Sequence, residues 1–308
     1  MKNQENSQAI VNQDIWGESW DFLIILDACR YDFFEKTYKK YFTKGSLKKV
    51  RSFSSNAPRT LTIDWLNKNF TKNHEDIIFL SSNPIINSKI PWKDSQGLSF
   101  SGKDTFYKVI DLWDSNWNDK YGTVFPDEFS KALFKEKKKN PKKRFILDVM
   151  QPHYPYIGKN YRKYFLKKED ELEKKEKIFN REKSKKERKN NLKETFQKKI
   201  RSPIAELIKK NLGDELSWKL MKLFKIKPKA SWTLIGIQEG MSGIRRAYEE
   251  NLEFALSHIS TLSKNLKGRI VITADHGEYL GEKGFLGHGK NPPHSEVITD
   301  VPWFVINN

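Results

Sequence analysis

The sequence predicts an α/β fold in which a central, mostly parallel sheet is flanked by helices. Two apolar runs rich in β-branched residues, 22–27 and 269–274, have the length and continuous hydrophobicity of strands buried on both faces. Each run delivers a carboxylate, Asp27 or Asp275, into a turn. A clear amphipathic helix pattern over residues 244–266 feeds directly into the second run. Because parallel strands end at one edge of a sheet, where ligands bind, the two carboxylates are expected to converge.

The elements of the N-terminal half follow from hydrophobic spacing. Residues 29–43 are predicted to form a helix with its aromatic side chains on one side, and residues 50–53 a short strand. The next helix carries Trp65 among apolar residues at helical spacing, and residues 77–80 form a third strand. Residues 84–125, broken by glycines and aromatics, are expected to form a long loop over the sheet.

The C-terminal half alternates helices and strands in the same way. A helix is predicted over residues 126–134 and a fourth strand over residues 144–150. The helix over residues 244–266 is expected to end with Gly268 as its C-cap glycine. Residues 301–306 offer a last strand close to the C-terminus.

The positive charge of the chain is concentrated in one segment. The 308 residues carry a formal net charge of +18, and much of it falls within residues 159–210, where apolar periodicity is missing. This pattern predicts a basic helical or disordered insertion within a single catalytic domain spanning residues 1–308. A basic surface attracts nucleic acid, anionic lipid or an acidic polymer, but a solvated insertion is the simpler interpretation, and a nucleic-acid partner is not favoured.

The cellular compartment is predicted from what the sequence lacks. Cys29 is the single cysteine, which excludes an intrachain disulfide and a zinc site built from cysteines. No apolar run approaches the roughly 18 residues of a membrane span, and residues 1–14 show no signal-peptide pattern. A cytoplasmic protein without a transmembrane segment is expected.

A metal site is the main functional prediction from the residues themselves. Asp275 and His276 stand side by side before Gly277, and Asp27 ends another strand. Carboxylate oxygens with one imidazole suit Mn²⁺, Zn²⁺, Mg²⁺ or Ca²⁺. The alternatives are a capped turn for the Asp-His-Gly triplet and helix capping for Asp27.

Several blocks together resemble a known family. The blocks Ile24–Asp32, Met150–Gly158, Ile272–Glu282, Gly287–His288 and Val301–Trp303 resemble, in that order, the sulfatase-like members of the alkaline phosphatase superfamily. The resemblance implies an alkaline phosphatase-like sheet with one or two divalent metal ions at its carboxyl edge. It also implies hydrolysis or transfer of a phosphate or sulfate ester through a covalent enzyme intermediate.

The resemblance gives roles to the acidic and histidine residues. Asp27, Asp275 and His276 are expected to be metal ligands. His153 is expected to protonate the leaving group or to contact the oxyanion, with an ordinary surface-loop histidine as the alternative. His288 is expected to contact the substrate or to ligate a second metal ion.

Further residues are candidates for binding the anionic group of the substrate. Lys290 follows His288 closely, and Arg59 is a candidate anion contact, although an ion pair is the simpler role for that arginine. Asp148 precedes His153 by five residues and could join both histidines around a second ion.

Three hydroxyls near the start of the helix that contains Trp65 are candidates for the nucleophile: Ser55, Thr60 and Thr62. The free N–H groups at a helix start favour an attacking anion. Ser55 begins a segment similar to the sulfatase nucleophile pattern, and Thr62 begins one similar to a Thr-Pro-Glu-Trp-Leu block of sulfatase-like relatives. Ser55 is slightly preferred.

The commonest sulfatases oxidise a cysteine instead, but Cys29 is expected in the core. An unmodified hydroxyl favours phosphate esters, whereas a sulfatase would need Ser55 to be oxidised.

These patterns predict a metal-dependent hydrolase that cleaves a phosphate or sulfate ester through a covalent serine or threonine intermediate. The substrate is expected to be an anionic ester, such as a polysaccharide, glycolipid or nucleotide-linked precursor. Two other functions stay open. One is a phosphoglycerol- or phosphoethanolamine-type transferase at a membrane surface, and the other is a catalytically inactive protein that binds polyanions.

Overall fold

A computed structural model gives the fold, and it describes residues 10–54, 57, 59–165, 218–219, 223, 231–288 and 295–308. Most of the basic insertion predicted at 159–210 lies outside the described residues. The predicted nucleophile Ser55 and the predicted anion contact Lys290 also lie outside them.

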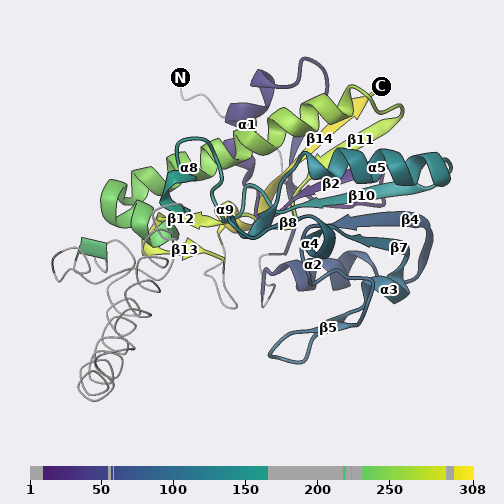
Figure 1. The fold of residues 1–308 in the computed structure, drawn as a ribbon, viewed down its shortest axis with the longest axis horizontal. Helices are drawn as coiled ribbons and strands as arrows, with labels where there is room; N and C mark the ends of the chain where they lie inside the picture. Colours follow the sequence, from purple (N-terminus) through teal and green to yellow (C-terminus); the bar gives the residue numbers. More distant parts are fainter. Residues whose placement is uncertain are drawn as a thin grey trace, which may run out of the picture. The chain divides into compact units, whose positions relative to one another are not determined.

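The central element is an eight-stranded sheet, drawn as arrows in Figure 1. Its strands follow one another in the order β1 (Val11–Asn12), β3 (Ser46–Arg51), β14 (Asp300–Asn307), β11 (Arg269–Thr273), β2 (Phe22–Leu26), β10 (Arg144–Val149), β4 (His74–Ser81) and β7 (Phe106–Asp111). Only β14 runs antiparallel to its neighbours in this sheet. The predicted central, mostly parallel sheet is confirmed.

The register of the central strands fixes the functional edge. Ile24 of β2 lies opposite Ile272 of β11 on one side and opposite Leu147 of β10 on the other. All three strands run parallel, so β2, β10 and β11 end at the same edge. The backbone N–H of Asp27, just past β2, donates to the carbonyl of Val149 at 2.9 Å.

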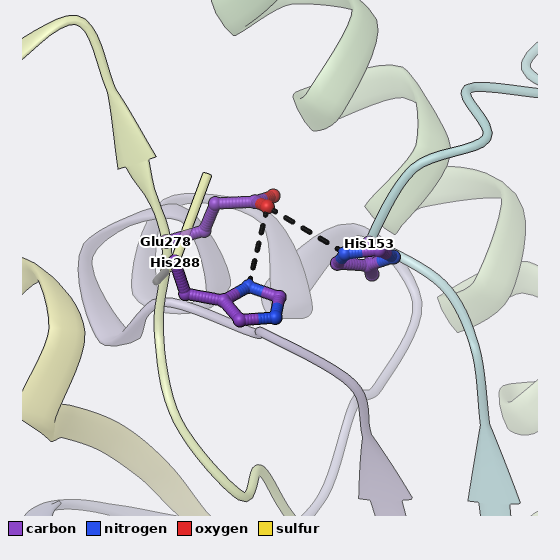
Figure 2. Close-up of side chains that lie close together, drawn as sticks. All are labelled: His153, Glu278 and His288. Atoms are coloured by element: carbon purple, nitrogen blue, oxygen red, sulfur yellow. Dashed lines mark ion pairs between the residues drawn. The ribbon is translucent and has the colours of Figure 1, made fainter. Parts of the chain in front are cut away.

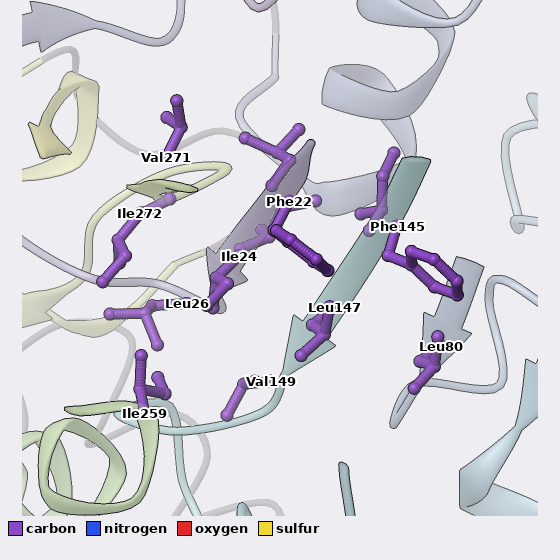
Figure 3. Close-up of a cluster of buried hydrophobic side chains, with 14 of the residues drawn as sticks. Phe22, Ile24, Leu26, Leu80, Phe145, Leu147, Val149, Ile259, Val271 and Ile272 are labelled. Carbon is purple, nitrogen blue, oxygen red and sulfur yellow. The ribbon is translucent and has the colours of Figure 1, made fainter. Parts of the chain in front are cut away.

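The longest helices that accompany the central sheet are α1 (Tyr31–Thr37), α2 (Thr62–Asn69), α5 (Glu128–Lys139) and α8 (Ser231–Ser263). Ile259 of α8 belongs to the same buried cluster as Leu26 of β2 and Val149 of β10, as Figure 3 shows. Side chains of this kind each contribute about 1.5–3 kcal/mol when fully buried. Packing of α8 against β2 and β10 therefore helps to fix the ends of these strands at the edge where Asp27 lies.

Residues 84–125, expected to form a long loop over the sheet, contain regular elements instead. This region holds β7 of the central sheet and six short elements. These elements are β5 (Trp92–Lys93), β6 (Ser99–Phe100), α3 (Gly102–Thr105), α4 (Leu112–Ser115), β8 (Trp117–Asn118) and β9 (Thr123–Val124). Because β7 is an edge strand, only Phe106 and Val109 of it are buried, and it lacks the apolar run of a central strand.

The observed bounds of several helices and strands differ from the predicted ones. The helix predicted over residues 29–43 ends at Thr37, and a 3₁₀ turn, Tyr38–Lys40, follows. The strand predicted at 50–53 begins earlier, at Ser46, where its exposed polar residues hide the pattern. The helix predicted to end near residue 134 continues to Lys139. Its last turn carries three lysines, whose positive charges stabilise the negative end of the helix dipole.

Gly268 has a different role from the one expected. The helix α8 ends at Ser263, so Gly268 is not its C-cap residue. Its φ of +121° and its two backbone hydrogen bonds with Asn308 make it the turn that starts β11. A Cβ at this position would lie 2.3 Å from a carboxylate oxygen of Asp21, which explains the glycine sterically as well.

The chain divides into two compact units. The first comprises residues 1–154, 251–278 and 288–308, and it holds the central sheet. The second comprises residues 155–250 and 279–287. Among the residues described, none of the helices combines the length and apolar character that crossing a bilayer demands.

The second unit is built around part of α8 and a short hairpin. The hairpin joins β12 (Tyr279–Leu280) to β13 (Leu286–Gly287), and Arg245 donates from Nε to the carbonyl of Leu280 at 2.9 Å. Within the same unit, Tyr161, Tyr164 and Arg246 all donate to the carboxylate of Glu239.

Candidate active site

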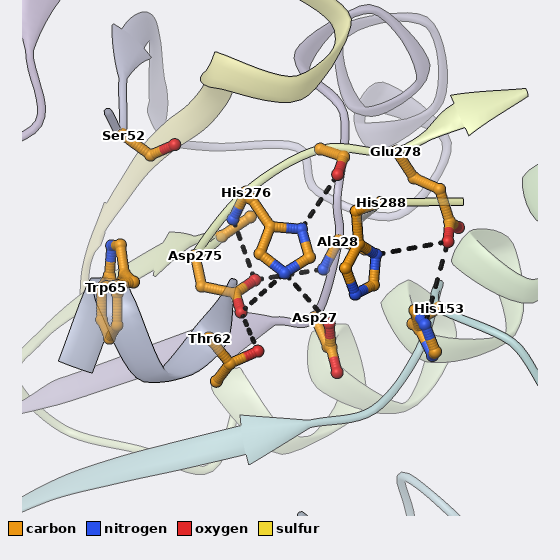
Figure 4. A network of polar contacts seen from close by, with 12 residues as sticks. Asp27, Ala28, Ser52, Thr62, Trp65, His153, Asp275, His276, Glu278 and His288 are labelled. Atoms are coloured by element: carbon orange, nitrogen blue, oxygen red, sulfur yellow. Dashed lines mark hydrogen bonds and ion pairs between the residues drawn. The ribbon is translucent and has the colours of Figure 1, made fainter. Parts of the chain in front are cut away.

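Three of the predicted metal ligands come together at the carboxyl edge of the sheet. Asp27 follows β2, and Asp275 and His276 follow β11, the neighbouring strand. The Nε2 atom of His276 lies 3.3 Å from Oδ2 of Asp275 and 4.0 Å from Oδ1 of Asp27. All three residues are buried, and we call them the buried cluster (Figure 4).

Backbone groups fix the carboxylate of Asp275. Its Oδ1 atom accepts hydrogen bonds from the backbone N–H of Ala28, at 3.1 Å, and of His276, at 2.9 Å. Ala28 adopts a left-handed conformation with φ of 57°, which is costly for a residue with a Cβ. In this strained turn the N–H of Ala28 points at Asp275, so the carboxylate of Asp275 joins the end of β2 to the end of β11.

Gly277 is required by close packing of the backbone. Its N–H donates to the carbonyl of Ile298 at 2.6 Å, and a Cβ would lie only 2.0 Å from the carbonyl oxygen of Val297. The glycine of the Asp-His-Gly motif therefore lets the segment that carries the ligands lie directly against the segment before β14.

The imidazole of His276 is held in the form that a metal ligand needs. Its Nδ1 lies 2.9 Å from the carbonyl oxygen of Gly277, so Nδ1 carries the proton and Nε2 presents a lone pair. Burial lowers the pKa of His276 to about 4, so the ring is neutral at ordinary pH. Both Nε2 of His276 and Oδ1 of Asp27 are buried without a hydrogen-bond donor. A lone pair and carboxylate oxygens that face one another in this way fit a divalent cation.

The charges of the buried cluster point to the same conclusion. Burial raises the pKa of Asp27 well above its usual value, and the neighbouring carboxylates of Asp275, Asp148 and Glu278 raise it further. Burial, together with the charge of Asp275, also raises the pKa of Asp148. A bound divalent cation would offset this repulsion and favour the ionised carboxylates.

Thr62 is the candidate nucleophile that the fold places on the buried cluster. It is the first residue of α2, and its Oγ1 donates to Oδ2 of Asp275 at 2.7 Å. Asp275 is 213 residues away in sequence, so the contact depends on the tertiary fold. Thr60 is fully buried, and its hydroxyl has no hydrogen-bond partner. Thr62 therefore combines a helix N-terminus with contact to a candidate metal ligand.

A second group of possible ligands adjoins the first, and we call it the outer cluster. Figure 2 shows its members, His153, Glu278 and His288. Oε1 of Glu278 lies 3.8 Å from Nε2 of His153 and 3.5 Å from Nδ1 of His288. The rings of His288 and His276 are 4.2 Å apart, so the two clusters are neighbours.

The outer cluster is partly exposed, and its charges are balanced internally. Burial alone would raise the pKa of Glu278, but His153 and His288 hold it below its usual value. Burial lowers the pKa of His153, so this ring is neutral near pH 7. Glu278 was not predicted as a site residue, although it stands in the Asp-His-Gly-Glu block beside the predicted ligands.

The loop that carries His153 is attached to the functional edge by its backbone. The N–H of His153 donates to the carbonyl of Asp27 at 3.2 Å. Asn251, in α8, donates from Nδ2 to the carbonyls of Pro152 and His153 at 3.1 and 3.0 Å. The loop after β10 is thus fixed to the same edge as the buried cluster.

Arg59 is engaged elsewhere. Its guanidinium pairs with Asp64 and Asp94 and also donates to the side chain of Gln96 at 2.6 Å. Arg59 therefore has the ion-pair role that was the simpler alternative to an anion contact. Its guanidinium is already engaged by these side chains and is not available to a substrate anion. Cys29 is buried, as expected for a core residue.

Comparison with known proteins finds similarity in structure only. No family model matches the chain, and no curated protein matches it in sequence. It is similar to the soluble domain of lipooligosaccharide phosphoethanolamine transferase A from Neisseria meningitidis, with 13% identity over 96% of this chain and 80% of that one and a TM-score of 0.47.

Two other solved structures are similar to a comparable degree. The C-terminal periplasmic domain of EptC from Escherichia coli, in complex with Zn, shares 11% identity over 97% of this chain and 77% of that one, with a TM-score of 0.46. Phosphonate monoester hydrolase from Agrobacterium radiobacter shares 14% identity over 93% and 67%, with a TM-score of 0.48.

Proposed function

We propose that this chain is a divalent-metal-dependent enzyme that transfers the phosphoryl group of a phosphate ester to Thr62 and then to water. One observation carries the proposal. The hydroxyl of Thr62, at the N-terminus of α2, donates to Asp275 within a buried cluster whose free ligand atoms face one another. This arrangement joins a nucleophile to a metal site at the ligand-binding edge of an α/β sheet.

The residues of both clusters supply the metal ligands. Asp27, Asp275 and His276 would hold one ion, and the outer cluster offers the ligands for a second. Mixed carboxylate and imidazole donors suit Zn²⁺ or Mn²⁺ better than Ca²⁺. A bound divalent cation would supply positive charge that stabilises the ester oxygens and lowers the pKa of the attacking hydroxyl.

The chemical step follows from the contacts of Thr62. Its Oγ1 forms a bond to phosphorus while the bond from phosphorus to the leaving oxygen breaks, and its proton passes to Oδ2 of Asp275. His153 is neutral near pH 7, so it suits an N–H contact to an ester oxygen, or ligation of a second ion, rather than protonation of the leaving group. The leaving alkoxide then takes its proton from water. In the second step water attacks phosphorus while the bond from phosphorus to Oγ1 breaks. Asp275 returns its proton to Oγ1, and the proton that the attacking water loses neutralises the hydroxide left by the first step.

A threonine nucleophile favours phosphate esters over sulfate esters. The commonest sulfatases make their nucleophile by oxidising a cysteine, whereas Thr62 offers an unmodified hydroxyl. Cys29 is buried, and burial raises its pKa well above the usual value, so it does not provide a reactive thiolate. A sulfatase would have to use Ser55.

Kinetics of hydroxyl variants test the proposal. The metal-loaded protein is expected to hydrolyse bis-p-nitrophenyl phosphate or p-nitrophenyl phosphate in preference to p-nitrophenyl sulfate. Thr62→Ala should lower kcat by about 10³-fold or more, because the nucleophile is lost. Thr60→Ala and Ser55→Ala are the matched controls and should keep most activity. If Ser55→Ala abolishes turnover and Thr62→Ala does not, the proposed nucleophile is wrong.

The acceptor can be tested in the same assay. The natural substrate proposed is a phosphate ester of a polysaccharide or glycolipid precursor, and water is the proposed acceptor. With p-nitrophenyl phosphate as the substrate, added glycerol or ethanolamine should leave the rate of p-nitrophenol release and the yield of inorganic phosphate unchanged. Replacement of inorganic phosphate by a phosphorylated alcohol would instead make the protein a transferase.

A further inference from the structure

Gln13 connects the helix of the nucleophile to the strand of the metal ligands, although it belongs to none of the sequence motifs. It follows β1 and is 4% exposed. Its Oε1 accepts a hydrogen bond from the indole Nε1 of Trp65 at 2.6 Å. Its Nε2 donates to Oγ1 of Thr273 at 2.7 Å and to the carbonyl of Ala274 at 2.9 Å.

The orientation of this amide follows from the chemistry of its neighbours. An indole N–H can only donate, so the oxygen of Gln13 must face Trp65. The carbonyl of Ala274 can only accept, so the nitrogen must face β11. Thr273 accepts from Gln13 and donates onward to the carbonyl of Pro302 at 2.7 Å. Every donor and acceptor of the buried amide group therefore has a partner.

Among the described residues, two hydrogen-bonded connections join α2 to the end of β11, and the contacts of Gln13 form the second. The first is direct and runs from Thr62 to Asp275. The second runs from Trp65, one helical turn after Thr62, through Gln13 to Ala274, the residue before Asp275. Two connections one turn apart fix both the position and the rotation of the start of α2.

Ile63 and Leu66 of the helix are buried and Asp64 pairs with Arg59, but none of these three residues makes a hydrogen bond to β11. The helix is only eight residues long, and Leu61 at its N-cap makes no side-chain capping hydrogen bond. We propose that Gln13 is a positioning residue that holds the hydroxyl of Thr62 on Asp275, an inference that rests on the proposed role of Thr62. Without the amide, α2 can shift or rotate against β11, and a displacement of about 1 Å can cost about 10²-fold in rate.

Two tryptophans provide a matched pair of variants. Trp65 and Trp20 are both buried, and each donates one indole hydrogen bond, to Gln13 in the first case and to the carbonyl of Ile15 at 2.8 Å in the second. Replacing either with phenylalanine removes one buried N–H donor and leaves an acceptor without its partner. Both variants should therefore lose similar thermal stability, but only Trp65→Phe should disturb Thr62.

Steady-state kinetics of the full chain separate positioning from stability. Trp65→Phe and Gln13→Leu should each lower kcat by about 10- to 100-fold with KM changed by less than about twofold, because the nucleophile is misplaced while the substrate contacts remain. The double variant should be no worse than Gln13→Leu alone, since both changes break one connection. Trp20→Phe should keep kcat. Equal losses of kcat in Trp65→Phe and Trp20→Phe would overturn the proposal.

Crystal structures of the same variants decide the matter independently of turnover. The distance from Thr62 Oγ1 to Asp275 Oδ2 should stay within hydrogen-bond range in Trp20→Phe and lengthen beyond it in Gln13→Leu and Trp65→Phe. An unchanged distance in the last two variants would refute the positioning role. If the distance lengthens as expected but the wild-type protein hydrolyses no ester, the proposed function fails and the positioning role stands.

Discussion

The buried cluster and the outer cluster differ in how completely their surroundings fix them. In the buried cluster, two backbone N–H groups hold Asp275 and a backbone carbonyl orients His276. In the outer cluster, His153 and His288 are partly exposed and meet Glu278 only at ion-pair distances of 3.8 and 3.5 Å. In the proposed function the buried cluster would be pre-organised for a resident ion, whereas the outer cluster would adapt to the substrate or to a second ion.

Asp275→Asn should have the largest effect of the changes that test this difference. Asp275 is both a candidate metal ligand and the acceptor of the Thr62 hydrogen bond, so its charge serves the ion and the nucleophile together. We expect turnover to fall by about 10³-fold or more. Calorimetric titration with Mn²⁺ or Zn²⁺ should show loss of the tightest site. Full metal binding and full turnover in this variant would contradict the assigned role.

Glu278→Gln should have a smaller effect, confined to the outer cluster. It keeps the shape of the side chain but removes the charge that pairs with His153 and His288. We expect turnover to fall by about 10- to 100-fold while the tightest metal site is retained. The matched control is Glu239→Gln in the second unit, which removes a carboxylate from a cluster of tyrosines and Arg246. If Glu278→Gln abolishes the tightest site, the two clusters are one site.

The smallest predicted effect is a dependence of metal stabilisation on pH. Burial and neighbouring carboxylates raise the pKa of Asp27 above 3.8. In the metal-free protein this carboxyl therefore contributes its full stabilisation below pH 3.8, and the contribution is lost as pH rises through the raised pKa. Metal binding needs ionised Asp27 and therefore strengthens in the same direction. The ring of His276, whose pKa is about 4, becomes protonated and so loses its metal-binding lone pair only near pH 4 and below. The rise in Tm caused by Mn²⁺ should grow from about pH 4 to 8, and a rise that stays constant would contradict this prediction.

Much of the fold and of the buried cluster could be predicted from the sequence. Central parallel strands are buried on both faces, so they leave continuous apolar runs, and such runs deliver Asp27 and Asp275 to one edge. The edge strand β7 could not be found in this way, because an edge strand exposes much of its surface.

The identity of the nucleophile and its support depend on tertiary contacts that leave no local pattern. Thr60 and Thr62 both precede apolar residues at helical spacing, and only the fold shows that α2 begins at Thr62, on Asp275. Gln13 lies 261 residues from Ala274 in sequence, and no spacing rule relates such positions. Glu278 had a signal, since it stands in the Asp-His-Gly-Glu block beside the ligands.

The most direct test of the proposed function is tandem mass spectrometry of the metal-loaded protein, quenched with acid during turnover of bis-p-nitrophenyl phosphate. Phosphoryl transfer through the buried cluster predicts a covalent p-nitrophenyl phosphate ester on Thr62 that is absent from Asp275→Asn. An ester on Ser55 instead, or continued turnover with no modified hydroxyl, would contradict it.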